Sequence, residues 1–176
     1  MENQGKLLGF IATAKGAKII YTDNVVEQDE LTYKKLTVEV ERSPSNNLLL
    51  ALRTLLTHAL IKCELTEGKI KEKEVNSRKT VDMPAFKGYS IDSFSIKGDG
   101  EDEKLSIKMT KVTSAGDSFT IAVPDILIVD NNNPYENQLA EDLDNLITEC
   151  NNFREGKNYF VQGDLFKEKV SAGKED

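Results

Sequence analysis

The stretch YKKLTVEVERSPSNNLLLALRTLLTHALIKCEL, residues 33–65, changes its hydrophobic period halfway along. In its first part Leu36, Val38 and Val40 alternate with charged and hydroxyl side chains, which predicts a β-strand with one wet face. The turn-rich cluster RSPSNN then supplies helix-capping residues, and the leucines that follow cover more than one stripe of a helix. A half-exposed strand followed by a deeply buried helix predicts an α+β fold.

The same order of elements occurs on both sides of a polar, charged stretch at residues 66–84. Before it, two short apolar runs flank a Lys-Gly turn and precede the strand and helix just described. After it, three alternating runs are separated by turns rich in glycine and aspartate, and an amphipathic helix follows the cluster DNNNPYEN. The predicted strands are residues 6–14, 17–22, 33–41, 88–97, 104–112 and 118–123, and the predicted helices are residues 48–65 and 136–154. This order, βββα-βββα, predicts an antiparallel sheet with two amphipathic helices packed on its dry face.

We expect one α+β domain at residues 1–156 and a C-terminal tail at residues 157–176, because 176 residues suit a single core. The two halves, residues 1–65 and 85–156, share their order of elements without clear residue identity. An ancient duplication and an independent use of a common α+β pattern both account for this parallel.

Composition favours a soluble protein of a reducing compartment. Charged residues make up 30% of the chain, hydrophobic residues 39%, and no apolar run is long enough for a membrane span. The N-terminus lacks the basic region and apolar core of a signal peptide. Cys63 and Cys150 each lie late on a predicted helix, so we expect two buried free thiols and no disulfide. The expected location is therefore the cytoplasm.

A net charge of -7 argues against a protein whose whole surface binds nucleic acid, but it is compatible with a local basic patch. Residues 67–79 carry five basic side chains against three glutamates, a local charge of +2. The basic residues are Lys69, Lys71, Lys73, Arg78 and Lys79. Such a loop contacts phosphates without sequence specificity, and an ordinary solvated loop is the alternative interpretation. Tyr21 or Tyr33, if exposed on the wet sheet face, would add base stacking.

The sequence contains no recognisable catalytic or metal-binding pattern, so we expect no enzyme, no metal and no cofactor. His58 is the only histidine and has no second histidine or cysteine pair at metal-ligand spacing, so we expect a structural residue. Neither a G-x-S-x-G elbow nor a phosphate-binding P-loop is present. The acidic turn with Asp99, Glu101, Asp102 and Glu103 lacks the spacing of a calcium loop and is expected to be solvated.

The tail contains YFVQGDLF, residues 159–166, in which five of eight residues are apolar or aromatic. Its last five residues resemble the bacterial sliding-clamp-binding motif, which has Gln, two variable residues and then Leu-Phe. The residues that carry the resemblance are Gln162, Asp164, Leu165 and Phe166. The resemblance implies that the glutamine satisfies backbone groups at a pocket rim while the leucine and phenylalanine enter a preformed apolar pocket. Gly163 stands where the strongest form of the motif has leucine, which removes one apolar contact.

Folding of the tail back onto the domain is the alternative use of these apolar residues. Tyr159, Phe160, Leu165 and Phe166 would then form a short terminal helix or strand and complete the core. The two interpretations predict opposite results when a sliding clamp is added.

The overall layout resembles a group of small uncharacterised proteins encoded by bacteriophages of gut bacteria. The similarity rests on the phrase KCEL at the end of the first helix, on Gly156 and Lys157, and on the motif at residues 162–166. It implies a phage or mobile-element origin and a place in DNA replication or recombination in a bacterial host cell.

Together these expectations predict a noncatalytic accessory protein of DNA replication or recombination. Its tail would bind the DNA sliding clamp, single-stranded DNA is a second candidate partner, and no membrane partner is expected. The alternatives are an acidic inhibitor or decoy of a host DNA-processing or defence protein, a virion structural component and, last, a two-metal nuclease.

Overall fold

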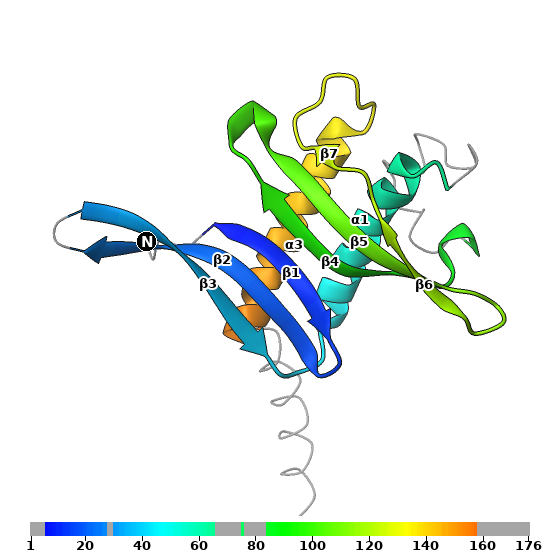
Figure 1. Ribbon diagram of the computed structural model, residues 1–176, viewed down its shortest axis with the longest axis horizontal. Helices are drawn as coiled ribbons and strands as arrows, with labels where there is room; N and C mark the ends of the chain where they lie inside the picture. The colour runs from blue at the N-terminus through cyan, green and yellow to red at the C-terminus, as the bar shows by residue number, and fades with distance from the viewer. Residues whose placement is uncertain (1–5, 28–29, 66–74, 76–83, 158–176) are drawn as a thin grey trace, which may run out of the picture.

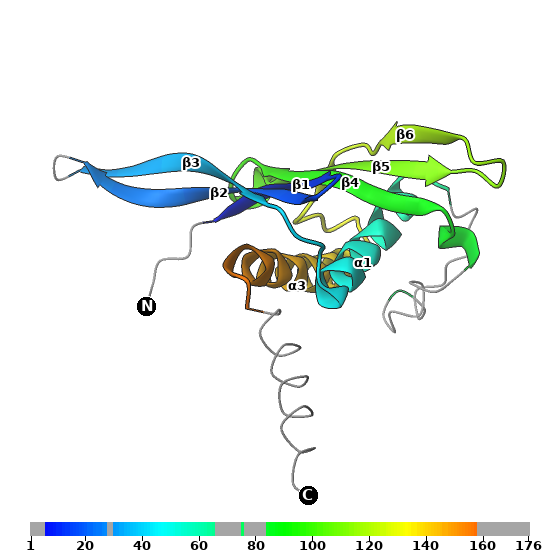
Figure 2. The same cartoon turned by 90° about the horizontal axis from the view of Figure 1, so that it is seen from below.

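The computed structural model describes residues 6–27, 30–65, 75 and 84–157, and the side chains of residues 23–33 and 85 lie outside this description. Seven strands form one antiparallel sheet in these ranges, and two α-helices lie together beneath one of its faces (Figures 1 and 2). The strands are β1 (Leu7–Thr13), β2 (Gly16–Glu27), β3 (Glu30–Val40), β4 (Tyr89–Lys97), β5 (Lys104–Val112), β6 (Ser118–Ala122) and β7 (Ile126–Leu127). The helices are α1 (Asn46–Lys62) and α3 (Glu136–Glu155), with short 3-10 turns η2 (Pro84–Phe86) and η3 (Gly100–Asp102). The predicted α+β class and element order are confirmed.

The strand order β3-β2-β1-β4-β5-β6 places the first strand of each half at the centre of the sheet. β1 pairs antiparallel with β4, and the later strands of each half extend outward from this pair. β7 adds a two-residue ladder to β5. The two halves therefore occupy the two sides of the sheet, and α1 packs against α3 across the boundary between them.

The hairpin of β2 and β3 is longer than predicted. Residues 23–32 were expected to form a loop, but pairing continues from Thr22 and Lys35 to Glu27 and Glu30. Asp and Asn disfavour strands, whereas the β-branched Val25 and Val26 favour them, and hairpin pairing decides in favour of the strand. Beyond Tyr21, β2 pairs only with β3, so this ribbon projects past β1 at the left of Figure 1.

Capping residues mark the start of α1 and the end of α3, whereas Tyr135 at the start of α3 makes no side-chain capping hydrogen bond. Ser45 has an extended backbone and its Oγ accepts a hydrogen bond from the Leu48 amide at 3.2 Å, which starts α1. Gly156 ends α3 with φ of 77°, a left-handed conformation that favours glycine. Neither helix in the described ranges is long and apolar enough to cross a membrane.

The core lies between the helices and the sheet. Phe10 of β1 and Phe94 of β4 stack at its centre, with ring centroids 5.9 Å apart and planes 8° apart. Leu55 of α1 and Leu146 of α3 are fully buried against this layer. Because side chains alternate along a strand, burying one set commits the other set to the opposite face of the sheet.

Candidate nucleic-acid interface

The sheet face opposite the helices is not covered by any element that the structure describes (Figure 2). Its residues alternate with the buried ones and are mainly lysine, serine and threonine. On β1 to β5 they include Ile11, Lys18, Ile20, Lys35, Thr37, Glu39, Ser93, Ser95, Lys97, Lys104, Ser106, Lys108 and Thr110. We call this surface the open face.

Strand register places two lysines directly opposite each other on the open face. Lys97 of β4 pairs with Lys104 of β5, and both side chains are exposed. Directly opposed like charges destabilise a strand pair by up to about 1 kcal/mol. A bound anion such as phosphate would relieve this repulsion, so the pair is suited to binding one.

A second row of side chains crosses four strands. Lys18 pairs with Ile11, Ile11 pairs with Ser93, and Ser93 pairs with Lys108. Neighbouring strands lie about 4.8 Å apart, so the backbone positions of the two lysines are roughly 14 Å apart. Ile11 is 41% exposed between them and offers an apolar surface.

The open-face lysines differ in their partners. Lys18 forms an ion pair with Glu39 at 3.3 Å, but both side chains are about half exposed, so the pair is weak. Lys97, Lys104 and Lys108 have no ion-pair partner within the part of the chain that the structure describes. These three cations are therefore available to a ligand.

Two acidic side chains are held by hydroxyl groups of β5. The Ser106 hydroxyl donates to Asp125 Oδ1 at 2.6 Å, and the Thr110 hydroxyl donates to Asp92 Oδ2 at 2.7 Å. Ser106 and Thr110 are the open-face neighbours of Lys108 along β5, so the two carboxylates flank this lysine. Their negative charge reduces the attraction of phosphate to Lys108.

The acidic turn is more structured than expected. Lys6 Nζ lies 2.6 Å from Glu103 Oε1 and 3.3 Å from Asp99 Oδ1, so part of the turn is paired and not simply solvated. The hydrogen bond that Lys6 donates to Glu103 raises the pKa of Lys6 above its ordinary value of 10.5, against a smaller opposing effect of burial. No group of three or more potential metal ligands occurs among the described residues.

Two sets of predicted binding residues lie outside the described ranges. They are the basic residues Lys69, Lys71, Lys73, Arg78 and Lys79, and the clamp-motif residues Gln162, Asp164, Leu165 and Phe166. Both sets stay predictions.

Tyr21 does not lie on the open face. It has the same strand parity as the buried Ala17 and Ile19, which places it on the helix-covered side of β2. There the Arg154 guanidinium lies 4.3 Å from the centre of its ring. Tyr21 therefore cannot provide the base stacking considered from the sequence.

His58 is a buried structural residue, as predicted. Its Nε2 lies 2.9 Å from Asp142 Oδ2, and the Gln138 amide donates to Asp142 Oδ1 at 3.2 Å. All three side chains are buried and connect α1 to α3. The network has the geometry of a helix-to-helix link.

The cysteines are free, as predicted. Cys150 is fully buried, and burial raises the pKa of its thiol from 9.0 to about 12, with a further contribution from the charge of Glu149. Cys63 is only half-buried, and burial raises the pKa of its thiol as well. Because thiolates are the nucleophilic form, neither cysteine is activated for chemistry.

No protein-family model, curated protein or solved structure matches the chain.

Proposed function

We propose that this protein is a noncatalytic accessory of DNA replication or recombination that binds single-stranded DNA on its open face. The observation that supports this proposal best is the group of exposed lysines on β4 and β5 that have no ion-pair partner among the described residues, in a chain with net charge -7. Phosphate binding requires clustered basic side chains, and an acidic protein surface that binds no anion does not.

A single strand suits this surface because it presents both phosphates and unpaired bases. The lysines would contact phosphates, while the serine and threonine hydroxyls would donate hydrogen bonds to phosphate or base oxygens. Ile11 lies in the same row as Lys18 and Lys108, and Ile20 lies in the neighbouring row; both would contact base faces without reading sequence. We therefore expect binding that is weak, salt-dependent and tolerant of sequence.

Salt dependence provides the first test. With about three to five lysine–phosphate contacts, the slope of log K against log salt should lie at roughly -2 to -3.5 for a single strand. Fluorescence anisotropy of a labelled oligothymidine, titrated with the full-length protein at several salt concentrations, measures it. Replacing Lys108 by alanine should weaken binding several-fold and make the slope about 0.7 less negative.

Lys62 provides the matched control. It is an exposed lysine in the last turn of α1, on the helix side of the molecule. The Lys62→Ala variant should bind as the parent does. Equal losses in Lys62→Ala and Lys108→Ala would contradict binding on the open face, and no measurable binding by the parent would favour the inhibitor or decoy function.

We propose further that the tail tethers the protein to a bacterial sliding clamp through Gln162, Asp164, Leu165 and Phe166. This part rests on the resemblance of the motif alone. Burial of Leu165 and Phe166 would contribute about 1.5 to 3 kcal/mol each, so micromolar binding, about -8 kcal/mol, also requires the hydrogen bonds of Gln162 and of the peptide backbone.

Calorimetric titration of a purified clamp with the full-length protein tests the tether. Binding should be micromolar and should be lost in the double variant Leu165→Ala, Phe166→Ala. The variant Val170→Ala removes an apolar side chain from the same tail outside residues 159–166 and should retain parent affinity. The tether would be rejected if the parent protein gave no heat of binding, or if the motif variant still bound the clamp. Neither result would bear on DNA binding by the open face.

A further inference from the structure

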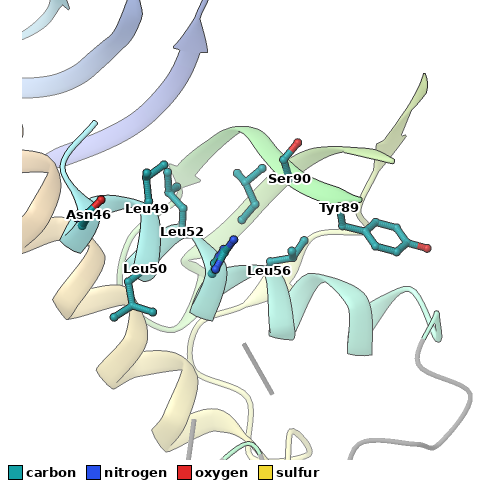
Figure 3. A pocket seen from close by; sticks show the side chains of 9 residues that line it. Asn46, Leu49, Leu50, Leu52, Leu56, Tyr89 and Ser90 are labelled. Carbon is teal, nitrogen blue, oxygen red and sulfur yellow. The ribbon is translucent and has the colours of Figure 1, made fainter. Parts of the chain in front are cut away.

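An apolar groove runs between the first half of α1 and the start of β4 (Figure 3). It has a volume of about 570 Å³. Apolar residues line most of it, namely Leu49, Leu50, Leu52, Leu56, Tyr89 and Ile91. Leu49 and Leu50 are 46% and 53% exposed, so two leucines of α1 face water, whereas the helix's other leucines are buried. Adjacent exposed leucines beside a groove are typical of a docking surface.

We propose that the occupant of this groove is the chain's own C-terminal peptide, residues 159–166. The first support is the position at which the tail leaves the domain. Arg42 donates hydrogen bonds to the carbonyls of Phe153 and Arg154, and a Cβ at Gly156 would lie 3.0 Å from its Nη1. The end of α3 therefore lies beside Arg42, only four residues before Asn46 at the rim of the groove.

Chain length is the second support. From Arg42 to Arg53 the chain has four residues before α1 and seven along it, a path of no more than about 25 Å. The nine residues from Asn158 to Phe166 span up to roughly 30 Å when extended. The peptide can therefore reach the groove without any movement of α1 or α3.

Chemical complementarity is the third support. The peptide brings five apolar or aromatic residues to a groove lined mainly by leucines. Arg53 lines the groove as well, is exposed, and has no ion-pair partner among the described residues. Asp164, between Gln162 and Leu165 in the peptide, would supply the opposite charge.

Docking of the tail in its own groove requires neither DNA nor a clamp, so it goes beyond the proposed function. A tethered peptide experiences an effective concentration on the order of millimolar, so an intrinsic dissociation constant of about 0.1 mM would keep about nine tails in ten docked. Leu165 and Phe166 cannot fill this groove and a clamp pocket at the same time. Docking would therefore lower the apparent affinity for a clamp about ten-fold at that occupancy.

The test uses a tryptophan reporter in the full-length protein. The chain contains no tryptophan, so Phe166→Trp introduces a single fluorophore within the peptide. In the native protein its emission should be blue-shifted, and acrylamide should quench it several-fold less than in the same protein unfolded in guanidinium. Adding Leu50→Glu should restore nearly full quenching, because the new carboxylate places a negative charge in the groove and repels Asp164.

Val129→Glu is the matched control, since Val129 is 48% exposed and does not line the groove. It should leave the tryptophan protected. Circular dichroism confirms that each variant is folded, and Arg53→Glu replaces Leu50→Glu if the latter unfolds. A tryptophan as accessible in the native parent as in the unfolded chain would overturn docking, and protection that persists in the folded groove variant would overturn this groove as the site.

Discussion

At the residue scale, the buried contact between His58 and Asp142 joins the two halves of the chain. The residues are 84 positions apart, and each lies on the helix that ends its half. Asp142 also accepts a hydrogen bond from Gln138. One carboxylate therefore satisfies two buried polar groups, and its removal should cost more than the loss of a surface charge.

We expect Asp142→Ala to lower the free energy of unfolding by about 2–4 kcal/mol, because it leaves the His58 ring and the Gln138 amide buried without their acceptor. Urea unfolding monitored by circular dichroism measures the change. Asp144→Ala removes an exposed carboxylate from the same helix and should change stability by less than about 0.5 kcal/mol. Similar losses in the two variants would show that the buried network contributes little.

Cys150 should make the fold sensitive to alkaline pH. Its thiol has a pKa of about 12 in the folded state against 9.0 ordinarily, so between these values the unfolded chain releases a proton that the folded chain retains. The folded state then binds more protons, and stability falls as pH rises from about 9 towards 12, by up to about 4 kcal/mol. Below pH 9 both states are protonated and this group has no effect.

Urea unfolding at a series of pH values from 7 to 11 isolates this contribution. Cys150→Ala should be less stable than the parent at neutral pH, yet should lose stability more slowly above pH 9. Cys63→Ala serves as the comparison, because Cys63 is only half-buried and should alter the alkaline slope less. If the stability of Cys150→Ala falls above pH 9 as steeply as that of the parent, groups other than Cys150 cause the loss of stability.

At the element scale, Arg42 fastens the end of α3 to the end of β3. Its guanidinium donates to the Phe153 and Arg154 carbonyls and lies 5.3 Å from the Phe153 ring centre. These carbonyls belong to the last turn of α3, where a cation also complements the helix dipole. The planar guanidinium can bond a carbonyl and stack on the ring at once, which an ammonium cannot.

We expect Arg42→Ala to destabilise the protein by about 1–3 kcal/mol and Arg42→Lys to recover only part of that loss. Differential scanning calorimetry of the two variants beside the parent gives the comparison. Lys62→Ala, which removes an exposed cation from α1 outside the groove, should leave the melting temperature almost unchanged. Full recovery by lysine would mean that charge alone, without the guanidinium geometry, holds α3.

Periodicity was sufficient to predict most elements, because their buried faces repeat clearly along the chain. The leucines of α1 and the alternation in β5 are examples, and Ser45 was among the predicted caps. The outer part of the β2–β3 hairpin was predicted wrongly, since pairing between strands outweighs the poor strand preference of Asp23 and Asn24. β7 has only two residues, too few for a periodic signal.

The open face was only partly predictable. Alternation in residues 104–112 indicates that Lys104 and Lys108 face away from the core, but no local pattern places Lys97 opposite Lys104. That pairing depends on strand register, which is set by the hairpin and by burial of the whole sheet. The contact between His58 and Asp142 was missed for the same reason, because it joins residues that are distant in sequence.

At the scale of the whole molecule, the two faces of the sheet have separate roles. The core lies between one face of the sheet and the helices α1 and α3, which Figure 2 shows on the same side, and strand register places the lysines on the opposite face. A nucleic acid bound on the open face would therefore contact few residues on which the fold depends. Open-face variants should consequently change DNA binding with little change in stability, which makes them suitable for functional tests.

Photochemical crosslinking of the full-length protein to oligothymidine, followed by mass spectrometry, tests the central claim most directly. The account predicts crosslinks in β1, β4 and β5, at or beside Ile11, Ser93, Lys97 and Lys108, and few in the outer surfaces of α1 and α3. Crosslinks confined to residues 66–83 or to the helix side would contradict it, because DNA would then bind without using the open face.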